Sequence, residues 1–592
     1  MNYRLRNNYS KDESFCLQEI LKDRGVEDID KFLSPSKECE LNPYLLDNIK
    51  EGAEMLLKHL RKGNRICLIL DCDTDGSSSS SILWLYIKKV FPSSNLDFTI
   101  HEHKQHGLED KINWLIDDEH YDLVIVPDAG SFDGSFMRQL QEVGTEVLCL
   151  DHHQLPEDYD MKKETPSNAI VINNQLSPNY SNKSLCGAGV VYKFCEVLDD
   201  ILGINLANEF IDLAALGEIA DVMNRCDVET NYIIMEGLRN IKNEGLMTLI
   251  ESQNYSLKER AQYPYHGLTP IDVAFYIAPL INAIIRVGSM QEKETLFYCF
   301  IDPNKIVKST KRGAKPQDTE TASEQTARVG ANAKARQNKI KERALDLIDF
   351  RIQKNNLDEN NIIIVELEDE DDIPQEMTGI IAMAVVSKYG KPCMIGRKNS
   401  LGNIQGSIRS NSNFAGLPSF KKFLEESQLV NFVAGHDNSA GWGAKENNID
   451  SLLEYANTNL NKESFSSSYL VDYIFKSEEK ELIPVGMKIA SHPEFFGNGI
   501  DEVKVVITDI SLSNVLVMGA DKSSIKINSN SIDYVRFKDL DFIEEVMNNR
   551  QKKLSIYGRL NLNSWGGRKP SLQIFIDDYD FQEEDNDSRF DF

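Results

Sequence analysis

The stretch that decides the fold reads Ile66-Cys67-Leu68-Ile69-Leu70-Asp71-Cys72-Asp73-Thr74-Asp75-Gly76. Its first five residues are apolar throughout, which predicts a buried strand. Five serines and the apolar run 82–87 follow, and they predict a helix. Three carboxylates therefore lie on one strand-to-helix turn. Because like charges repel, a divalent cation between them is the simplest explanation, and a solvated acidic turn that caps the helix is the alternative.

Length and composition set the class of protein. The chain has 592 residues, which predicts three or four domains. Its ten cysteines include no Cys-x-x-Cys pair, so neither a disulfide framework nor a thiolate zinc site is indicated, and we expect a cytoplasmic protein. We expect no secretory signal and no apolar run long enough to span a bilayer. The formal net charge of −28 argues against nucleic acid as a partner unless a basic groove is confined to part of the surface.

Two further apolar runs end on acids in the same way. Residues 123–126 lead into Asp128, and residues 147–150 lead into Asp151-His152-His153. All three runs predict central parallel strands, and the carboxyl ends of such strands form the ligand crevice of an α/β sheet. Seven side chains should therefore converge at this edge: Asp71, Asp73, Asp75, Asp128, Asp151, His152 and His153.

Asp221 follows an apolar, small-residue segment and precedes Val222-Met223. These neighbours predict a poorly solvated carboxylate, and a buried carboxylate needs a partner. A helix C-terminal cap or a buried ion pair would supply one, but the other acids favour a metal ligand. The glycine turn 186–189, which opens a helix, is a weak phosphate-loop signal, since such turns more often serve close packing.

The pattern of the chain predicts six parts. Residues 304–354 hold thirteen Lys and Arg against six acids, which indicates a basic connector. We expect it to be polar and mobile from Lys311 to Thr326 and helical from Ala327 to about Lys354. Beyond it, glycine-rich turns at 405–410 and 434–441 belong to a second α/β domain. The parts are a helical lead-in (1–60), an α/β domain (61–303), the connector (304–356), a smaller α/β domain (357–462), an all-β domain (463–582) and an acidic tail (583–592).

In order and spacing, four motifs resemble those of the DHH phosphoesterases. They are Asp73-x-Asp75-Gly76, Asp128-x-Gly130, Asp151-His152-His153 and Ala215-Leu216-Gly217-x-x-Ala220-Asp221-Val222. The longer context is similar to the RecJ branch, the single-strand-specific 5′→3′ DNA exonucleases. Further matches lie at Gly187-x-Gly189-Val190, Pro279-x-x-Asn282-Ala283-x-x-Arg286, Gly406-Ser407-x-Arg409-Ser410, Gly435-His436 and Asn563-x-Trp565-Gly566-Gly567-Arg568.

The resemblance implies an architecture and an activity. The fold would be a DHH parallel sheet and a smaller DHHA1-type α/β domain, joined by a long helix and followed by an oligonucleotide-binding (OB) barrel. The protein would be a monomeric enzyme that hydrolyses single-stranded DNA to 5′-mononucleotides in repair, recombination or replication.

The resemblance also implies a site with two ions, Mn²⁺ or Mg²⁺. Asp73 and Asp128 would bind one ion, with Asp71 in or beside its shell. The second ion would be held by Asp75, Asp128, His152 and Asp221. His153 would contact the scissile phosphate. Carboxylates with one imidazole suit these cations.

Substrate contacts are implied as well. The residues that would grip the terminal 5′-phosphate or the nearby backbone are Asn282, Arg286, Ser407, Arg409 and His436. The basic connector and the barrel would follow the strand further out. Trp565 would stack on a base, although a place in the barrel core is equally compatible with the sequence.

The chain departs from the family in three places, of which Ala129 in place of the usual Asn after Asp128 changes no implied contact. Leu280 stands where the family has Arg, which removes one candidate phosphate contact. Between His101 and Leu108 the family has an Arg and Gly-Tyr-Gly, and His103 or Lys104 is expected to compensate. The charge of −28 predicts that DNA binding is strongly salt-sensitive. It also predicts that DNA binds only in the cleft that the resemblance implies between the two α/β domains.

Other functions stay open at this point. A DHH phosphodiesterase for short oligonucleotides or cyclic dinucleotides would share the α/β domains but lack the connector and the β domain. An inactive DHH-like replication scaffold would have broken metal motifs, and here all implied ligands are present. The acidic tail ending at Phe592 resembles peptides that dock onto basic pockets, which would add a protein partner such as a single-strand-binding protein.

Overall fold

The structure is a computed structural model of the chain, and it describes residues 2–103, 105–155, 159–257, 267–399, 402–465, 469–563 and 569–582. The chain forms two compact units. We call Leu5–Gly330 with Val471–Phe592 the large unit, and Met1–Arg4 with Ala331–Leu470 the small unit.

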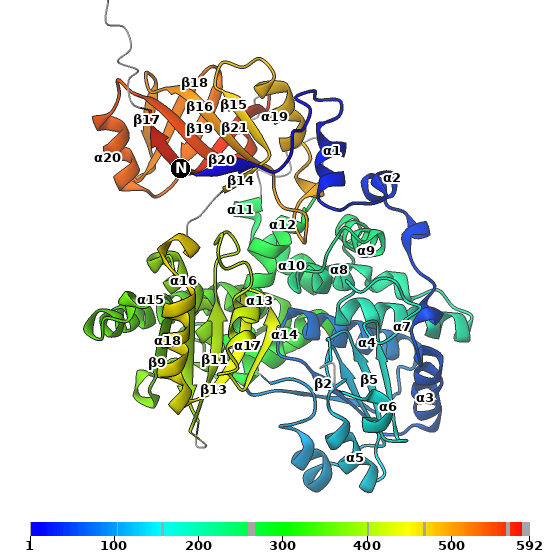
Figure 1. The fold of residues 1–592 in the computed structure, drawn as a ribbon. Coiled ribbons are helices and arrows are strands. Elements are labelled where there is room, and N and C mark those ends of the chain that lie inside the picture. The colour runs from blue at the N-terminus through cyan, green and yellow to red at the C-terminus, as the bar shows by residue number, and fades with distance from the viewer. Residues whose placement is uncertain are drawn as a thin grey trace, which may run out of the picture. The chain divides into compact units, whose positions relative to one another are not determined.

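Five parallel strands form the first sheet of the large unit, in the order β3-β2-β4-β5-β6 (Figure 1). Their bounds are Ile66–Leu70 (β2), Leu96–Ile100 (β3), Leu123–Pro127 (β4), Glu146–Asp151 (β5) and Ala169–Asn173 (β6). The three predicted central strands are confirmed as β2, β4 and β5, and every residue of β2 and β4 is buried. The strand order reverses between β2 and β4, which is the place where open α/β sheets bind ligands.

Helices surround this sheet and extend the large unit. Their bounds are Cys16–Asp23 (α1), Ile29–Leu33 (α2), Ile49–Lys62 (α3), Thr74–Val90 (α4), Gly134–Glu142 (α5), Met161–Glu164 (α6), Gly187–Leu202 (α7), Ile211–Ala220 (α8), Val228–Arg239 (α9), Glu244–Ser252 (α10), Asn254–Leu257 (α11), Pro270–Asp272 (α12), Ala278–Val287 (α13) and Met290–Ile301 (α14). Helix α3 lies directly on the sheet, because a Cβ at Gly52 would meet Ile172 of β6 at 2.7 Å.

Helix α4 is buried although it begins with a run of serines. All of Ser77–Ser81 are buried, and most of their hydroxyls donate to carbonyls about one turn back, as Ser78 Oγ does to Thr74 O at 2.8 Å. Small side chains that satisfy their own hydroxyls let the helix approach β2. A Cβ at Gly76 would lie only 2.5 Å from Asp71 Cβ, so the start of α4 rests on the end of β2.

The C-terminal part of the large unit is a β domain with seven strands in the order β15-β16-β20-β21-β19-β18-β17. The bounds are Tyr473–Lys476 (β15), Lys504–Ser511 (β16), Val515–Met518 (β17), Ser524–Ser529 (β18), Ile532–Arg536 (β19), Lys553–Asn563 (β20) and Ser571–Phe581 (β21), with helices Leu482–Ala490 (α19) and Leu540–Asn548 (α20). Ile20 of α1 and Phe32 of α2 share its hydrophobic core with Tyr473 and Val505. The first two helices of the lead-in therefore pack on the β domain, whereas α3 packs on the first sheet.

A mixed sheet forms the centre of the small unit, in the order β12-β13-β11-β10-β9. The bounds are Ile363–Leu367 (β9), Cys393–Lys398 (β10), Asn403–Arg409 (β11), Phe432–His436 (β12) and Ser439–Lys445 (β13), with helices Thr378–Tyr389 (α16), Phe420–Ser427 (α17) and Ile449–Asn459 (α18). Two short strands, Tyr3–Leu5 (β1) and Tyr469–Val471 (β14), pair with each other.

The two glycine-rich turns predicted in this domain are wrong for most of their length. Residues 405–409 lie in β11, and 434–436 and 439–441 lie in β12 and β13. Glycine here serves close strand approach, since a Cβ at Gly406 would lie 1.9 Å from Ile395 O.

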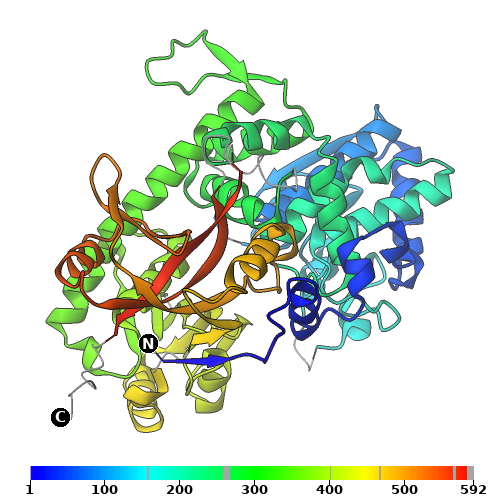
Figure 2. The same cartoon turned by 90° about the horizontal axis from the view of Figure 1, so that it is seen from above.

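The connector contains the predicted long helix, Ala322–Lys354 (α15). Ile306–Lys308 (β7) and Thr319–Thr321 (β8) form a hairpin before this helix (Figure 2). Of the stretch that we expected to be mobile, the part from Thr319 on is therefore regular structure. Glu320 organises this hairpin by accepting hydrogen bonds from Ser309 Oγ at 3.1 Å and Arg328 Nη2 at 2.7 Å. Because this segment is polar and basic, its sequence did not predict that Glu320 would be a buried hydrogen-bond acceptor.

One stretch corrects the expectation about apolar runs. Among the described residues, Pro270–Val287 has the length and mean hydropathy (1.5 over 18 residues) of a membrane span. It is made of α12, Val273–Ile277 (η6) and α13, and 56% of it is buried inside the protein. That burial is typical of a core helix, whose apolar surface faces neighbouring elements.

A buried ion pair ties the lead-in to the β domain and gives a test of this packing. Arg24 Nη2 lies 2.7 Å from Asp472 Oδ1, and both side chains are almost fully buried. Arg24→Met should lower the free energy of unfolding by about 3 kcal/mol, because it removes the closer of two cations from a buried carboxylate. The second cation, Arg6, stays with its Nε at 3.5 Å from Asp472 Oδ1. Urea unfolding measures this loss. Lys31→Met removes a half-exposed partner of Asp28 at 3.6 Å and should cost under about 1 kcal/mol. Equal losses in the two variants would contradict the assignment.

Candidate metal centre

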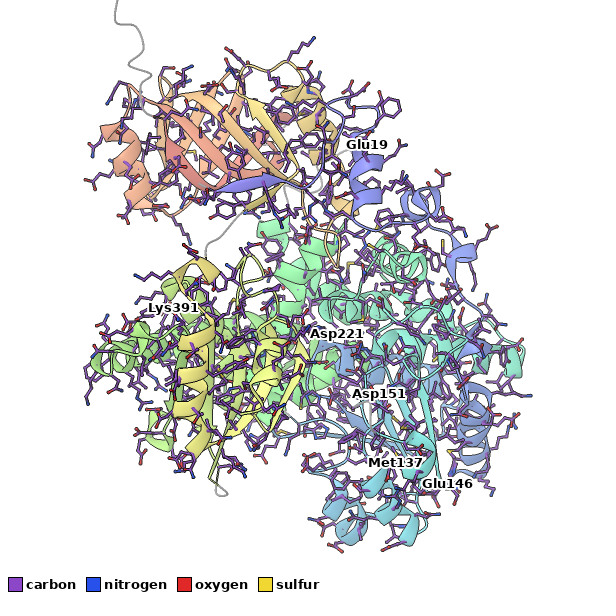
Figure 3. The ribbon with its side chains drawn as sticks, in the orientation of Figure 1. Glu19, Met137, Glu146, Asp151, Asp221 and Lys391 are labelled. Atoms are coloured by element: carbon purple, nitrogen blue, oxygen red, sulfur yellow. The ribbon has the colours of Figure 1, made fainter. Side chains whose placement is uncertain are left out.

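Five elements of the large unit bring acids and histidines together. β2, β4 and β5 contribute from their carboxyl ends, Asp75 lies in the first turn of α4, and Asp221 follows the end of α8. Figure 3 labels Asp221 and Asp151. Potential ligand atoms lie within 4.8 Å of one another in three groups: Asp71, Asp73 and Asp128; Asp75, His152 and Asp221; and Asp128, His152 and His153. The structure therefore brings together every residue that the sequence singled out as a ligand.

His152 lies between the acids. Its Nε2 is 3.2 Å from Asp128 Oδ1, 3.6 Å from Asp221 Oδ2 and 3.8 Å from Asp75 Oδ2. Burial, and then the neighbouring His153, lower the pKa of His152. A neutral imidazole has a lone pair to offer a cation.

Asp73 has a second task besides any metal. Its Oδ1 accepts a hydrogen bond from Gly76 N at 2.9 Å and so caps α4. The helix-cap interpretation of this turn is therefore confirmed for Asp73. A carboxylate has lone pairs left after one such bond, so the cap and a metal contact are compatible on one residue.

Asp75 is held by the first turn of α7. Gly187 N donates to Oδ2 at 2.7 Å and Ala188 N donates to Oδ1 at 2.9 Å. The glycine turn that gave a weak phosphate-loop signal thus binds an anion of the chain itself, at the positive end of a helix. The turn also serves close packing, since a Cβ at Gly187 would lie 2.3 Å from Asp128 Oδ1. Gly217 of α8 has the same role, because a Cβ there would lie 2.3 Å from Asp75 Oδ1.

Asp128 and Asp221 carry the unfavourable charge of the cluster. Asp128 has a left-handed φ of 68°, and its buried Oδ1 has no hydrogen-bond partner among the described residues. Burial, and then Asp75 and Asp73, raise the pKa of Asp128 well above its usual range. The same causes raise the pKa of Asp221 to about 8. A divalent cation would reverse both shifts, because it favours the ionised carboxylates. The donor set therefore fits a hard divalent ion.

Asp151 organises the turn that carries the two histidines. Its Oδ1 accepts from His152 N at 2.7 Å, His153 N at 3.0 Å and His153 Nδ1 at 2.8 Å. Burial opposes ionisation, but the bond from His153 and the charges of both imidazoles hold the pKa of Asp151 well below its usual range. For His153, burial is outweighed by Asp151, which raises the pKa to about 9. Its half-exposed ring is therefore a cation at the rim of the site.

His106 is a site residue that the sequence motifs did not single out. Its Nδ1 lies 2.7 Å from Asp71 Oδ2, and its ring centroid is 6.4 Å from that of His153. The carbonyl of His103 accepts a hydrogen bond from Cys72 Sγ at 2.9 Å, and the expectation that His103 compensates in this segment stays a prediction. The pairing of β3 with β2 could have indicated His106, because it places the loop after Ile100 beside Asp71.

Asn282 and Arg286 of α13 lie beside the acids of the candidate metal centre. They line a cavity of about 170 Å³ with Asp73, Thr74, Asp75, Ala220 and Asp221. Thr74 Oγ1 donates to Asn282 Oδ1 at 3.0 Å. Burial lowers the pKa of Arg286, with Asp73 acting against that shift. Leu280 is buried instead, and a Cβ at Gly330 of α15 would meet it at 3.2 Å, so its side chain serves packing.

The other predicted phosphate contacts share one end of the sheet in the small unit. Arg409 of β11 and His436 of β12 both pair with Ser439 of β13, so they lie in one row across three strands. Ser407 is two residues before Arg409 and its Oγ is 2.9 Å from Thr378 Oγ1. Arg409 lines a hollow of about 650 Å³ with Lys341, Gly379, Ile380, Met383, Ala384, Ser387 and Lys388.

A second hollow of about 650 Å³ lies in the large unit between η6 and the β domain. Its lining includes the exposed rings of Phe275 and Phe537, together with Tyr276 and Phe575. Its lining also includes the cations Arg536, Lys538 and Arg559 and the acids Glu502, Asp539 and Asp577. Arg536 Nε is 2.6 Å from Asp539 Oδ2, and Arg559 Nε is 3.2 Å from Asp577 Oδ2. Sequence patterns missed these aromatics, because the chain brings them together from segments far apart. Trp565, Lys104 and the acidic tail 583–592 lie outside the described residues.

Comparison with known proteins agrees with this arrangement. Residues 65–218 match the DHH family, N-terminal domain, and residues 485–578 match the RecJ OB domain. The putative SPbeta prophage-derived single-strand DNA-specific exonuclease YorK of Bacillus subtilis is 34% identical, over 97% of this chain and 98% of its own. The single-stranded-DNA-specific exonuclease RecJ of Bacillus subtilis is 25% identical, over 90% of this chain and 64% of its own.

The crystal structure of RecJ in complex with Mn²⁺ from Thermus thermophilus has a similar fold. It aligns with a TM-score of 0.70 over 95% of this chain and 75% of that chain, at 21% identity. The fold is therefore mixed α/β, with a DHH parallel sheet and a C-terminal OB domain. Since the likeness to YorK extends over nearly the whole of both chains, the chain belongs to the DHH family, in its branch of RecJ- and YorK-type proteins.

Proposed function

We propose that the protein is a metal-dependent exonuclease that hydrolyses single-stranded DNA from the 5′ end to 5′-mononucleotides. The observation that carries this proposal is the convergence of five carboxylates and two histidines in three overlapping groups, each with its ligand atoms within 4.8 Å of one another. The names of YorK and RecJ supply the substrate class, and RecJ has been solved with Mn²⁺ and with Mg²⁺.

Two ions, Mn²⁺ or Mg²⁺, would be held by separate sets that share Asp128. Asp73 and Asp128, with Asp71 beside them, would hold one ion. The second would be held by Asp75, Asp128, His152 and Asp221. Bound ions supply Lewis acidity toward the phosphodiester and lower the pKa of water.

The chain's own cations would bind and orient the DNA. His153, whose Nδ1 is engaged by Asp151 at 2.8 Å, can present Nε2–H to the scissile phosphate. Arg286 lines the cavity beside Asp73 and can form charge-assisted hydrogen bonds to a terminal phosphate, with Asn282 next to it. In the small unit, Ser407, Arg409 and His436 are proposed to contact phosphates of the DNA.

The hollow between η6 and the β domain is proposed to carry the strand away from the site. Aromatic rings with interspersed cations are what sequence-independent binding of unstacked bases requires. This feature, together with residues 485–578, favours an exonuclease over a DHH phosphodiesterase for dinucleotides, which would lack the β domain. Complete ligand sets argue against an inactive scaffold.

Removal of the shared ligand should abolish turnover. Asp128→Asn should reduce hydrolysis of single-stranded DNA by about a thousandfold or more, because both metal sets lose a charged ligand. Digestion of a 5′-labelled strand with Mn²⁺, and with Mn²⁺ removed by chelation, measures this. Asp117→Asn changes an exposed acid outside the ligand groups and should leave the rate unchanged. Full activity of Asp128→Asn would refute the metal assignment.

Arg286 should read the terminal phosphate. Arg286→Ala should lower kcat/KM on 5′-phosphorylated strands by about tenfold to a hundredfold, which is the range for a hydrogen bond to a charged group, and should affect 5′-hydroxyl strands less. The ratio of the two substrates is the measurement, and Arg286→Lys should keep part of the preference. An equal loss on both ends would exclude a role in end recognition.

The hollow should contribute affinity without contributing to chemistry. Phe537→Ala should weaken binding of a 20-nucleotide single strand about tenfold, from the loss of one stacked base, and should leave hydrolysis of a dinucleotide unchanged. Fluorescence anisotropy measures the affinity. Leu516→Ala removes a similarly exposed apolar side chain, from β17, that does not line the hollow and serves as the control. Equal affinities for the Phe537 and Leu516 variants would count against this binding surface.

A further inference from the structure

The metal centre receives a contact from the β domain that no motif indicates. The loop Phe496–Gly499, between α19 and β16, reaches the C-terminal end of α8. Asn498 Nδ2 donates to Glu218 O at 2.9 Å and to Ile219 O at 3.4 Å. These are carbonyls of the last turn of α8, which have no partner within the helix. Asn498 is only 8% exposed, so these hydrogen bonds are shielded from solvent.

The turn that follows α8 is strained. Val222, directly after Asp221, has a φ of 57°, a left-handed conformation that β-branched residues rarely adopt. The Val222 side chain is 65% exposed, so its own packing does little to hold it there. Val222 N donates to Ile219 O at 3.2 Å and Met223 N donates to Glu218 O at 3.0 Å. Asn498 therefore bonds the same two carbonyls that close the strained turn.

A second set of contacts locks the loop onto the chain beyond the turn. Arg225 N donates to Asn498 O at 2.9 Å, and Arg225 Nη1 donates to Phe496 O at 3.1 Å. Arg225 is fully buried, and its Nη2 donates to Asn231 Oδ1 at 2.7 Å. Gly499 has a φ of 89°, and a Cβ there would lie 2.3 Å from Asn224 Oδ1. The loop thus grips the chain on both sides of Asp221.

We infer that Asn498 is a positioning residue of the metal centre, whose side-chain amide holds the turn that carries Asp221. Asp221 needs such support more than the other acids do. Asp71 and Asp128 follow central strands directly, and Asp73 and Asp75 are fixed by backbone donors. Asp221, in contrast, follows a helix end and has a strained residue after it. Partners that orient a ligand typically change metal affinity by about tenfold to a hundredfold when removed. The inference rests on the proposed metal centre.

The test is the affinity of the metal-free full chain for Mn²⁺, read as free Mn²⁺ by electron paramagnetic resonance. Asn498→Gly removes the amide and tolerates the φ of 51° found at this position. Asn530→Gly is the matched control, because Asn530 has the same φ of 51° in the same β domain and its Nδ2 donates to Ser477 Oγ at 3.1 Å, away from α8. Val222→Asn/Asn498→Gly places at the strained position a residue that accepts a left-handed backbone.

We expect Asn498→Gly to weaken Mn²⁺ binding about tenfold, Asn530→Gly to bind as the unchanged chain does, and the double variant to recover most of the loss. Mn²⁺ affinity of Asn498→Gly within twofold of the unchanged chain would overturn the inference. So would an equal loss in Asn530→Gly, or failure of Asn498→Gly alone to fold, since either would assign Asn498 a general structural role. Absence of Mn²⁺ binding by the unchanged chain would instead overturn the proposed metal centre, and this inference with it.

Discussion

Repulsion among the carboxylates at the carboxyl edge of the first sheet is the constraint on which the rest of the structure depends. The chain answers it residue by residue. Asp73 accepts from Gly76 N, Asp75 accepts from two amides of α7, and Asp71 contacts His106. Asp128 and Asp221 lack comparable help, and their pKa values are raised. Burial raises the pKa of Asp71 as well, in spite of His106, and its Oδ1 has no hydrogen-bond partner among the described residues. The negative charge that the protein does not compensate therefore lies on Asp71, Asp128 and Asp221, where a cation gains most.

The same constraint explains the glycines around the site. Backbone amides can neutralise a buried carboxylate only if helices approach it closely. A side chain at Gly76 would strike Asp71, one at Gly187 would strike Asp128, and one at Gly217 would strike Asp75. Each of these positions therefore excludes even alanine unless the acid moves. The glycines of the DHH motifs therefore allow close packing around the charged cluster, and the acids of the same motifs are the candidate ligands.

Much of this site could be predicted from the sequence, for a physical reason. Short apolar runs that end on acids predict both the central strands and the edge where the acids meet, so Asp71, Asp128 and His152 were found by local pattern alone. His106, Arg225 and Asn498 were not, because they act from loops whose position depends on tertiary packing. The hairpin around Glu320 and the strands at 405–409 were missed for a similar reason, since a buried acceptor and a close strand contact leave little trace in composition.

The first turn of α4 shows why fold and chemistry are difficult to separate in this protein. A helix cap and a metal ligand were alternatives for Asp73 when only the sequence was considered, yet one carboxylate has two oxygens and can serve both. The bond from Gly76 N orients the Asp73 carboxylate on the first turn of α4. Asp75 is oriented in the same way by α7. Contacts within the chain therefore orient these acids, and the fold bears the cost of holding like charges together. In such a centre the ion would reduce an existing repulsion instead of gathering scattered ligands, and this would favour binding in proportion to the strain it relieves.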